Sequence, residues 1–351
     1  MKNMLVTGGA GFIGSNFIRY MLEHEPDVHI VNLDALTYAG DMSNLEDLPD
    51  PDRHIFVKGD ICYLPTVSYI LGTYKIDTIV NFAAETHVDQ SIYAPECFMT
   101  TNVMGAFTLL EAVRMWYDSG KRPIRFHHVS TDEVYGSLDP LEAPWTEDSK
   151  YAPNSPYSAS KAASDYLVRA YGHTYGTPYT ITNCSNNYGP RQHLEKLIPL
   201  TITRALRWEK IPIYGDGRQI RDWIYVDDHC EALKRVLEAG VSGETYNIGG
   251  DNQTANIELV ETICGVLDKV APVGRPYSQL VEHVADRPGH DYRYAVNAGK
   301  IRKEFGWQPK ISLKEGIALT VKWYMEHKEW VEAIRNKVPY KEWLKQQYGG
   351  K

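Results

Sequence analysis

The sequence predicts an α/β fold in which a Rossmann-type doubly wound parallel sheet is joined by a smaller mixed α/β lobe that is mainly C-terminal. Short apolar runs recur at 3–8, 28–34, 54–60, 78–84 and 124–131, with helix-like segments between them. Alternation of this kind is typical of repeated βαβ units and a parallel sheet. A glycine-rich turn follows the first run, and after about residue 188 the pattern changes to pieces punctuated by Pro and Gly.

These changes of pattern predict two units with a discontinuous boundary. We expect residues 1–188 to form a dinucleotide-binding domain. The stretch 222–250, with its helix-like "DWIYVDDHCEALKRVLEAG" and its strand-like "TYNIGG", is expected to return to that domain. Residues 189–221 and 251–351 are left to form the second lobe, which we expect to bind the substrate.

Composition narrows the class of partner. Of the 351 residues, 43% are hydrophobic, enough for the cores of two lobes. Lys and Arg number 37 against 45 Asp and Glu, a net charge of -8, which gives no support to nucleic acid or an anionic membrane surface as a partner. Five widely spread cysteines without close pairs predict a reduced, cytoplasmic setting and no metal site. The first apolar run is too short for a signal segment or a membrane span.

The first motif, "TGGAGFIGS", predicts a dinucleotide site. Gly8 permits a tight turn, Gly11 lets the backbone approach a pyrophosphate, and Gly14 allows close packing of the helix that begins there. Asp34 follows Gly14 by 20 residues, where its carboxylate can accept hydrogen bonds from the adenosine ribose and would repel a 2'-phosphate. We therefore predict NAD rather than NADP, against the alternative of a turn without a ligand. Further cofactor contacts are expected from Phe12, Ile13, Asp60 and Ile61.

A second motif, "YSASK", places Tyr157 and Lys161 four residues apart, on one face of a predicted helix. A tyrosine with an ordinary pKa of about 10 can act as a base near neutral pH only if its phenolate is stabilised. A nearby ammonium and a positively charged nicotinamide ring provide that stabilisation. The alternative, an exposed lysine beside a half-buried tyrosine, is less favoured downstream of a dinucleotide motif.

A third motif, "STDEVYG", places two adjacent carboxyls, Asp132 and Glu133, after an apolar run. Oxidation of an alcohol by a nicotinamide has no use for an extra acid and base. Once a ketone is present, the neighbouring carbon can lose its proton and a β-hydroxyl can leave as water. That elimination needs one base and one protonated acid, which two carboxyls with different pKa values supply.

Together these motifs resemble the extended short-chain dehydrogenase/reductase family over residues from Met4 to about Trp323. The resemblance implies that Tyr157 takes a sugar hydroxyl proton, and that Lys161 binds the nicotinamide ribose and lowers the tyrosine pKa. It also implies that Ala83 and Ala84 pack along the cofactor, that Asn187 lies near the nicotinamide, and that the protein is a homodimer formed through helices around 101–117 and 157–175.

Further stretches, among them "LDALTYAG", "AAETHVDQSI", "NCSNNYGP" and "ADRPGHDYRYA", resemble the nucleotide-sugar 4,6-dehydratases of this family. The resemblance implies oxidation of a glucose ring at C4, removal of the C5 proton by Glu133 and protonation of the leaving C6 hydroxyl by Asp132. The hydride then returns to C6, and Thr131 orients the C4 oxygen. The expected substrate is dTDP-glucose, with UDP-glucose left open.

A nucleotide diphosphate calls for arginine forks, and Arg221 and Arg287 are the candidates. The remaining residues expected around the substrate are His87, Asn186, Glu195, Lys196, Leu197, Tyr214, Asn256, His290 and Tyr292.

Two other functions compete with this interpretation. A sugar-nucleotide 4-epimerase of the same fold would need Tyr157, Lys161 and NAD but no acid pair. A non-catalytic NAD-binding regulator would have no reason to keep Asp132 and Glu133 as well. The acid pair therefore distinguishes the three hypotheses.

Overall fold

The computed structural model describes residues 1–348 and confirms the predicted fold class. Within these residues, seven strands form one parallel sheet in the order β10-β6-β5-β4-β1-β2-β3. The chain reverses direction across the sheet between β1 and β4, which is where a doubly wound sheet binds its ligand. The strands are β1 (Asn3–Thr7), β2 (His29–Asp34), β3 (His54–Lys58), β4 (Thr78–Asn81), β5 (Arg125–Thr131), β6 (Tyr179–Cys184) and β10 (Thr245–Ile248).

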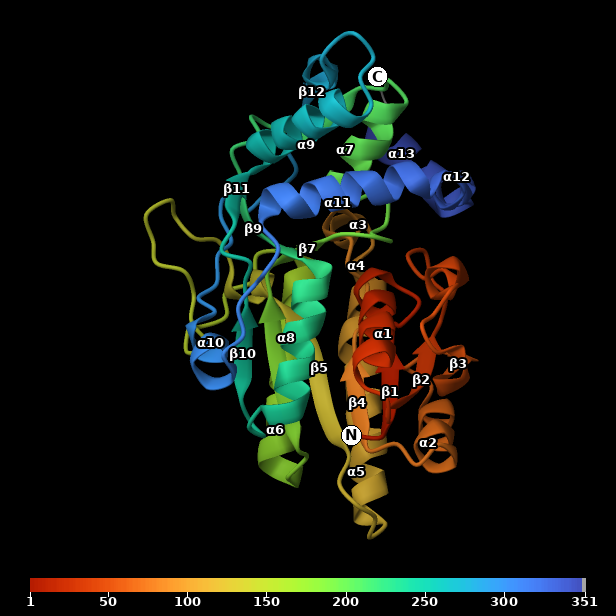
Figure 1. The fold of residues 1–351 in the computed structure, drawn as a ribbon. Coiled ribbons are helices and arrows are strands. Elements are labelled where there is room, and N and C mark those ends of the chain that lie inside the picture. The colour runs from red at the N-terminus through yellow and green to blue at the C-terminus, as the bar shows by residue number, and fades with distance from the viewer. Residues whose placement is uncertain (349–351) are drawn as a thin grey trace.

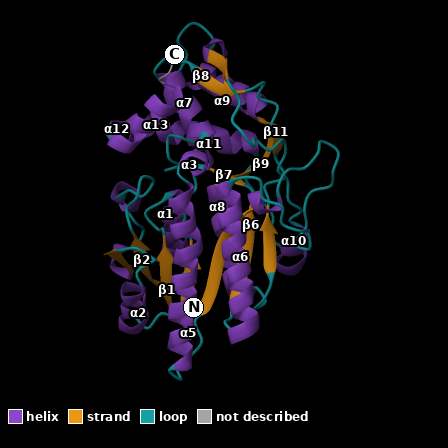
Figure 2. Cartoon of the chain, turned by 180° about the vertical axis from the view of Figure 1, so that it is seen from behind, coloured by secondary structure: helices purple, strands orange, loops and turns teal. Residues whose placement is uncertain are grey.

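Helices cover both faces of this sheet (Figures 1 and 2). One apolar core joins the sheet to α1, α8 and α10, and another joins it to α2, α5 and α6. Except in β3, the strands are buried almost throughout, as expected of a sheet covered on both faces, and β5 and β6 bury several polar side chains as well as apolar ones. The covering helices are α1 (Phe12–His24), α2 (Leu64–Thr73), α5 (Ala106–Asp118), α6 (Pro156–Tyr175), α8 (Val226–Ala239) and α10 (Gly299–Phe305). Between β4 and α5 lie α3 (Val88–Tyr93), α4 (Pro95–Phe98) and the π-helical η3 (Met99–Gly105).

The second lobe lies beyond the carboxyl ends of the sheet strands, at the top of Figure 1. It has its own apolar core. Two small sheets belong to this region, β11-β9-β7 and β12-β8. Their strands are β7 (Asn186–Tyr188), β8 (Ile211–Tyr214), β9 (Ile220–Tyr225), β11 (Gln253–Ala255) and β12 (Val281–Val284), and the helices of the lobe are α7 (Leu197–Leu206), α9 (Asn256–Val270), α11 (Leu313–Glu326), α12 (Lys328–Asn336) and α13 (Val338–Tyr348).

The predicted return to the main sheet is made by α8 and β10, whereas residues 222–225 were misplaced. They lie in β9, which pairs with β7 and β11 in the separate three-stranded sheet. The apolar run that ends β9 continues into α8 without a break. The sequence therefore does not show that β9 belongs to the small sheet while α8 covers the main one. The domain limits 1–188, 189–221 and 251–351 stay predictions.

No helix within residues 1–348 is both long and apolar enough to cross a membrane.

Candidate active site

The glycine-rich turn between β1 and α1 is shaped so that side chains would not fit. Gly8 has a φ of +70°, and a Cβ there would lie 2.7 Å from the backbone nitrogen of Ala83. A Cβ on Gly14 would lie 2.3 Å from the carbonyl oxygen of Gly8. Gly11 is the residue before the first turn of α1, so the helix N-terminus is open to an anion. The turn is thus a bare backbone cradle of the kind that a pyrophosphate needs.

Asp34 ends β2 beside this cradle. One oxygen of its carboxylate accepts a hydrogen bond from the backbone N–H of Ala10 at 2.9 Å, and the other accepts one from Leu36 at 2.7 Å. Burial raises the pKa of Asp34, while these two bonds oppose the rise. The carboxylate is therefore held in one orientation at the edge of the cradle, as a ribose acceptor should be.

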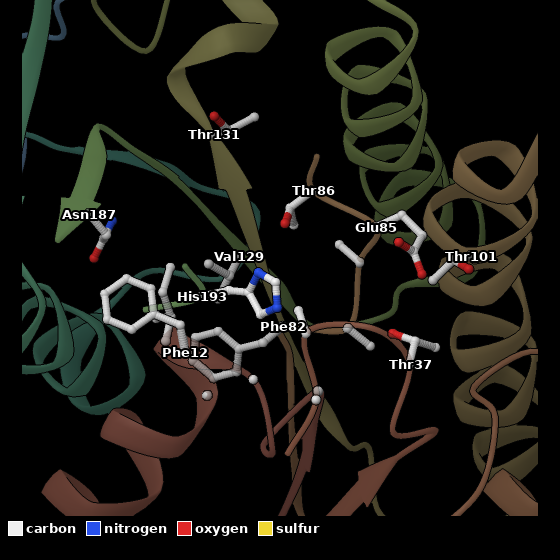
Figure 3. A pocket seen from close by; sticks show the side chains of 18 of the residues that line it. Phe12, Thr37, Phe82, Glu85, Thr86, Thr101, Val129, Thr131, Asn187 and His193 are labelled. Carbon is white, nitrogen blue, oxygen red and sulfur yellow. The ribbon is translucent and has the colours of Figure 1, made fainter. Parts of the chain in front are cut away.

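A cavity of about 300 Å³ runs from the cradle along the carboxyl ends of the strands. In Figure 3, Thr37, Glu85 and Thr101 lie on one side of it, while Asn187 of β7 lies on the other and Thr131 at the end of β5. Every cofactor residue predicted from the sequence lines this cavity: Gly8, Gly11, Phe12, Ile13, Gly14, Asp34, Asp60, Ile61, Ala83, Ala84, Tyr157, Lys161 and Asn187.

Tyr157 and Lys161 reach the cavity from the first turns of α6. The helix begins with a capping box, in which Ser155 accepts a bond from the Ser158 backbone N–H at 3.1 Å and the Ser158 hydroxyl accepts one from Ser155 at 3.0 Å. This cap fixes the turn that carries Tyr157, whose side chain is buried.

The charges around Tyr157 differ from the sequence-based expectation. Burial raises the pKa of Tyr157 well above its ordinary value, and Glu133 raises it further, while the Thr131 hydroxyl lowers it. The Lys161 ammonium donates instead to the backbone carbonyl of Val129 at 2.9 Å, and burial lowers its own pKa. Burial and Glu133, rather than Lys161, therefore have the main effects on the pKa of Tyr157.

Asp132 and Glu133 open the short 3₁₀ helix η4 (Asp132–Tyr135) directly after β5. Burial raises the pKa of Asp132 well above its ordinary value, and the neighbouring Glu133 adds to the rise. One carboxyl oxygen of Asp132 is buried and has no hydrogen-bond partner within residues 1–348. A carboxyl in this position suits a protonated acid with a proton to give.

Glu133 is in a different electrostatic environment. Burial also raises its pKa, but the arginines Arg287 and Arg221 draw it back down. The two adjacent carboxyls thus have different surroundings, and Glu133 is the one that positive charge favours as a carboxylate. Such a pair can serve as acid and base in one reaction.

Arg287 and Arg221, the two arginines that act on Glu133, belong to the second lobe. Arg287 contacts Asp89 at 3.0 Å, and its buried Nε has no hydrogen-bond partner in the described part of the chain. Arg221 donates to the backbone carbonyls of Asp291 and Tyr292, and its guanidinium stacks over the ring of Tyr294 at 4.2 Å. Positive charge is consequently gathered beside Glu133.

The other predicted substrate residues divide into three groups. Asn186, Glu195 and Lys196 line the cavity, and His87 lies 3.4 Å from Glu195. Tyr214 joins the cluster through Asp89, to which its hydroxyl donates at 3.0 Å. Four lie in the second lobe and are not among the residues that line the cavity, counted over residues 1–348: Leu197, Asn256, His290 and Tyr292.

Sequence reasoning missed several residues of this site. Glu85 is a buried carboxyl in the cavity, and burial raises its pKa. Asp89 links Arg287 to Tyr214. Both lie in the stretch "AAETHVDQSI" after β4, so their place at the carboxyl end of a central strand was the available signal. Other missed lining residues are Thr37, Thr86, Thr101, Gln192 and His193.

The comparison with family models decides the family. The GDP-mannose 4,6 dehydratase model matches residues 5–320. The chain belongs to this family. A dTDP-glucose 4,6-dehydratase of Xanthomonas campestris is 52% identical over 340 residues, which cover 95% of this chain and 96% of that protein.

Solved structures agree with this membership. The dTDP-glucose 4,6-dehydratase of Bacillus anthracis, in complex with NAD, has a TM-score of 0.85 and 45% identity, covering 95% of this chain and 100% of that one. A UDP-glucose 4-epimerase of Thermotoga maritima has a TM-score of 0.81 and 28% identity, covering 92% of this chain and 99% of that one. The fold is shared with both, and the sequence is nearer to the dehydratase.

Proposed function

We propose that this family member is an NAD-dependent lyase that dehydrates dTDP-glucose to dTDP-4-keto-6-deoxyglucose. The observation that carries the proposal is the adjacent pair of buried Asp132 and half-buried Glu133, which lines the same cavity as Tyr157 and the dinucleotide cradle. A 4-epimerase would use the tyrosine and the cradle but not the pair. The dehydratase names of the relatives agree with the proposal.

The cradle at Gly8 and Gly14 and the oriented carboxylate of Asp34 fit NAD. When bound, NAD supplies the acceptor for the hydride from C4 and later the donor of that hydride to C6. Lys161 would hold its nicotinamide ribose, and the positive nicotinamide would oppose the burial that raises the pKa of Tyr157.

The chain's own residues carry the protons. Tyr157 accepts the C4 hydroxyl proton, with Thr131 orienting the C4 oxygen. Glu133 removes the C5 proton as Asp132 protonates the C6 hydroxyl, which leaves as water. Glu133 then returns a proton to C5. At the end of the cycle Tyr157 holds one proton more and Asp132 one fewer than at the start. Passage of that proton from Tyr157 to Asp132, directly or through solvent, restores the site for the next turnover.

For the substrate side, we propose that Arg287 and Arg221 bind the diphosphate. The unpartnered Nε of Arg287 leaves part of its fork available for a phosphate oxygen. Asn186, Lys196 and Glu195 line the cavity within reach of a sugar, and His87 supports Glu195. Tyr214 supports Arg287 through Asp89. Leu197, Asn256, His290 and Tyr292 would serve the nucleotide end in the second lobe.

Turnover in deuterated water tests the reaction. The protein is incubated with dTDP-glucose and the product is followed by NMR. A 4-keto-6-deoxy product with deuterium at C5 is expected, because Glu133 exchanges its proton with solvent between steps. A galactose-type product would support the 4-epimerase instead. Turnover of UDP-glucose alone would show that the substrate carries uracil rather than thymine. NAD binding without turnover would favour the regulator.

We also propose a homodimer formed through residues 101–117 and 157–175. Large apolar side chains are exposed there, including Phe107 and Met115 on α5 and Tyr166 and Tyr175 on α6. Exposed apolar surface on two neighbouring helices is typical of an interface. Light scattering should give twice the chain mass, and a monomer at working concentration would contradict this.

We further infer a cytoplasmic setting. The five cysteines are free thiols, three of them buried, which suits a reducing compartment. Cell fractionation with an antibody to the chain tests this, and recovery in an oxidising compartment would contradict it.

A further inference from the structure

Asp165 is a fully buried carboxylate that the proposed mechanism does not use. It lies one helical turn after Lys161 on α6, and none of its surface is exposed. One of its oxygens accepts hydrogen bonds from the hydroxyls of Ser130 and Tyr151, both at 2.9 Å, and from the Asn183 amide at 3.3 Å. Burial raises the pKa of Asp165, while Lys161 and these three donors oppose the rise. Three donors on one oxygen favour the ionised carboxylate.

The hydrogen-bond pattern of His128 shows where the other oxygen points. Thr7 donates to Asn81 Oδ1 at 2.6 Å, so the Asn81 amide nitrogen is the group that faces His128 Nδ1, at 3.1 Å. His128 Nδ1 must then accept, and Nε2 carries the proton. The Nε2 atom lies 3.2 Å from the Ser164 hydroxyl and 3.5 Å from both the Lys161 ammonium and the second oxygen of Asp165, an oxygen without a hydrogen-bond partner among residues 1–348. The His128 ring therefore lies between Lys161 and Asp165.

The same carboxylate links α6, which carries Tyr157 and Lys161, to the end of β5, which precedes the acid pair. Ser130 lies between Val129, whose carbonyl accepts from the Lys161 ammonium at 2.9 Å, and Thr131, which precedes the acid pair. Asn183 bonds both Asp165 and the Thr131 carbonyl, the latter at 3.1 Å. Asp165 thus ties α6 to the end of β5 on both sides of Ser130.

We propose that Asp165 is a positioning residue, which keeps the buried Lys161 positively charged and fixes the Lys161 side of α6 against the end of β5 that bears the acid pair. The role of Lys161 in the dehydration rests on the proposed function. The effect of Asp165 on the charge of Lys161, and on the position of α6 against β5, does not depend on that function.

The titratable groups that face Lys161 come from three elements. Asp165 lies on α6, Cys184 on β6, and His128 on β5, where its Nε2 lies 3.5 Å from the ammonium. Burial lowers the pKa of Lys161, and Asp165 is the first of the groups that oppose this. His128 is neutral, because burial and the nearby ammonium hold its pKa well below the ordinary value. Asp165 itself faces Lys161, Arg169 and Tyr151.

Acetylation of Lys161 by acetic anhydride, followed across pH by mass spectrometry of the peptide, tests the proposal on the full chain. Only the neutral amine reacts, so the midpoint of the profile reports its protonation. Asp165→Asn keeps the volume and removes the charge, and we expect the midpoint to fall by about one pH unit. Tyr151→Phe removes a hydrogen bond from the same carboxylate but keeps the charge, and its midpoint should match that of the unchanged chain.

A midpoint that does not move in Asp165→Asn would overturn the proposal, even if thermal stability or turnover falls. Should that variant fail to fold, Asp165→Ser carries the same expectation. Dehydratase turnover is measured on the same proteins. If the unchanged chain gives no product from dTDP-glucose, the proposed function fails, while the acetylation profile still decides the role of Asp165.

Discussion

Two adjacent residues of one short helix, Asp132 and Glu133, have different electrostatic surroundings. Burial raises the pKa of each. For Asp132 the next largest causes are the carboxylates of Glu133 and Asp222, which raise its pKa further, whereas for Glu133 they are Arg287 and Arg221 of the second lobe, which lower it. The division into acid and base therefore depends on side chains that are more than 80 residues away in the sequence.

Glu133→Gln tests the division at the base. The amide cannot take the C5 proton, so we expect product formation to fall by about 10² to 10⁴, while C4 oxidation and the near-ultraviolet absorbance of NADH still appear. Glu282→Gln, an exposed change in β12, is the matched control and should turn over normally. Normal turnover by Glu133→Gln would remove Glu133 from this role.

Arg287→Gln tests the source of the difference. Glu133 must be ionised to act, so activity is lost as pH falls through its folded-state pKa. Removing the largest charge that lowers this pKa raises it, and the acid limb of the kcat profile should move to higher pH. KM should also rise about tenfold, as expected for a lost charged hydrogen bond. Arg218→Gln, exposed in the same lobe, should leave both unchanged. An unmoved acid limb would contradict the assignment.

Single residues could be predicted from the sequence where a local spacing fixes them. Gly8, Gly14 and Asp34 follow from the turn after β1, and Tyr157 with Lys161 from a helical repeat. Asp165 could not be predicted, because its partners come from other elements and a lone buried carboxylate has no sequence signature. For Asp89 only its place after a central strand was a signal, and its contact with Arg287 was not.

Among the elements, α6 contributes the pair Tyr157 and Lys161. Its capping box fixes the first turn, which contains Tyr157, and Lys161 follows one turn later. The sequence pattern predicted this helix and the strands of the main sheet other than β6, which no expected run covered. It failed at β9, since one apolar run serves both a strand of the small sheet and the entry to α8.

Ser155→Ala tests whether the cap matters for catalysis as well as for stability. Loss of a serine cap lowers the free energy of unfolding by about 1 kcal/mol, measured in urea. Because the frayed turn contains Tyr157, kcat should fall as well. Ser312→Ala removes the equivalent cap of α11, whose serine accepts from the Glu315 backbone N–H at 3.3 Å. We expect a similar loss of stability there without a loss of kcat. Equal effects on kcat in both variants would contradict a local role.

On the scale of the whole molecule, the C-terminal helices connect the second lobe to the glycine-rich turn. The Trp330 indole N–H on α12 donates to Asn44 Oδ1 at 2.9 Å, and the Asn44 amide donates to the carbonyl of Ala10 at 2.8 Å. Lys337 forms an ion pair with Asp41, whose backbone N–H also bonds Ala10, at 3.0 Å. Such contacts join residues almost 300 positions apart, which no local pattern of the sequence predicts.

Trp330→Phe tests this connection. The phenyl ring keeps most of the packing but loses the indole N–H, so Asn44 is no longer held and the loop at Ala10 is less well fixed. We expect NAD affinity to fall by about 1 kcal/mol, or roughly fivefold, measured by calorimetry on the NAD-free chain. Trp323→Phe makes the same change in a ring that packs 5.2 Å from Trp330, and NAD affinity should be unaffected there. If both variants bind NAD as the unchanged chain does, the C-terminal helices stabilise only their own lobe.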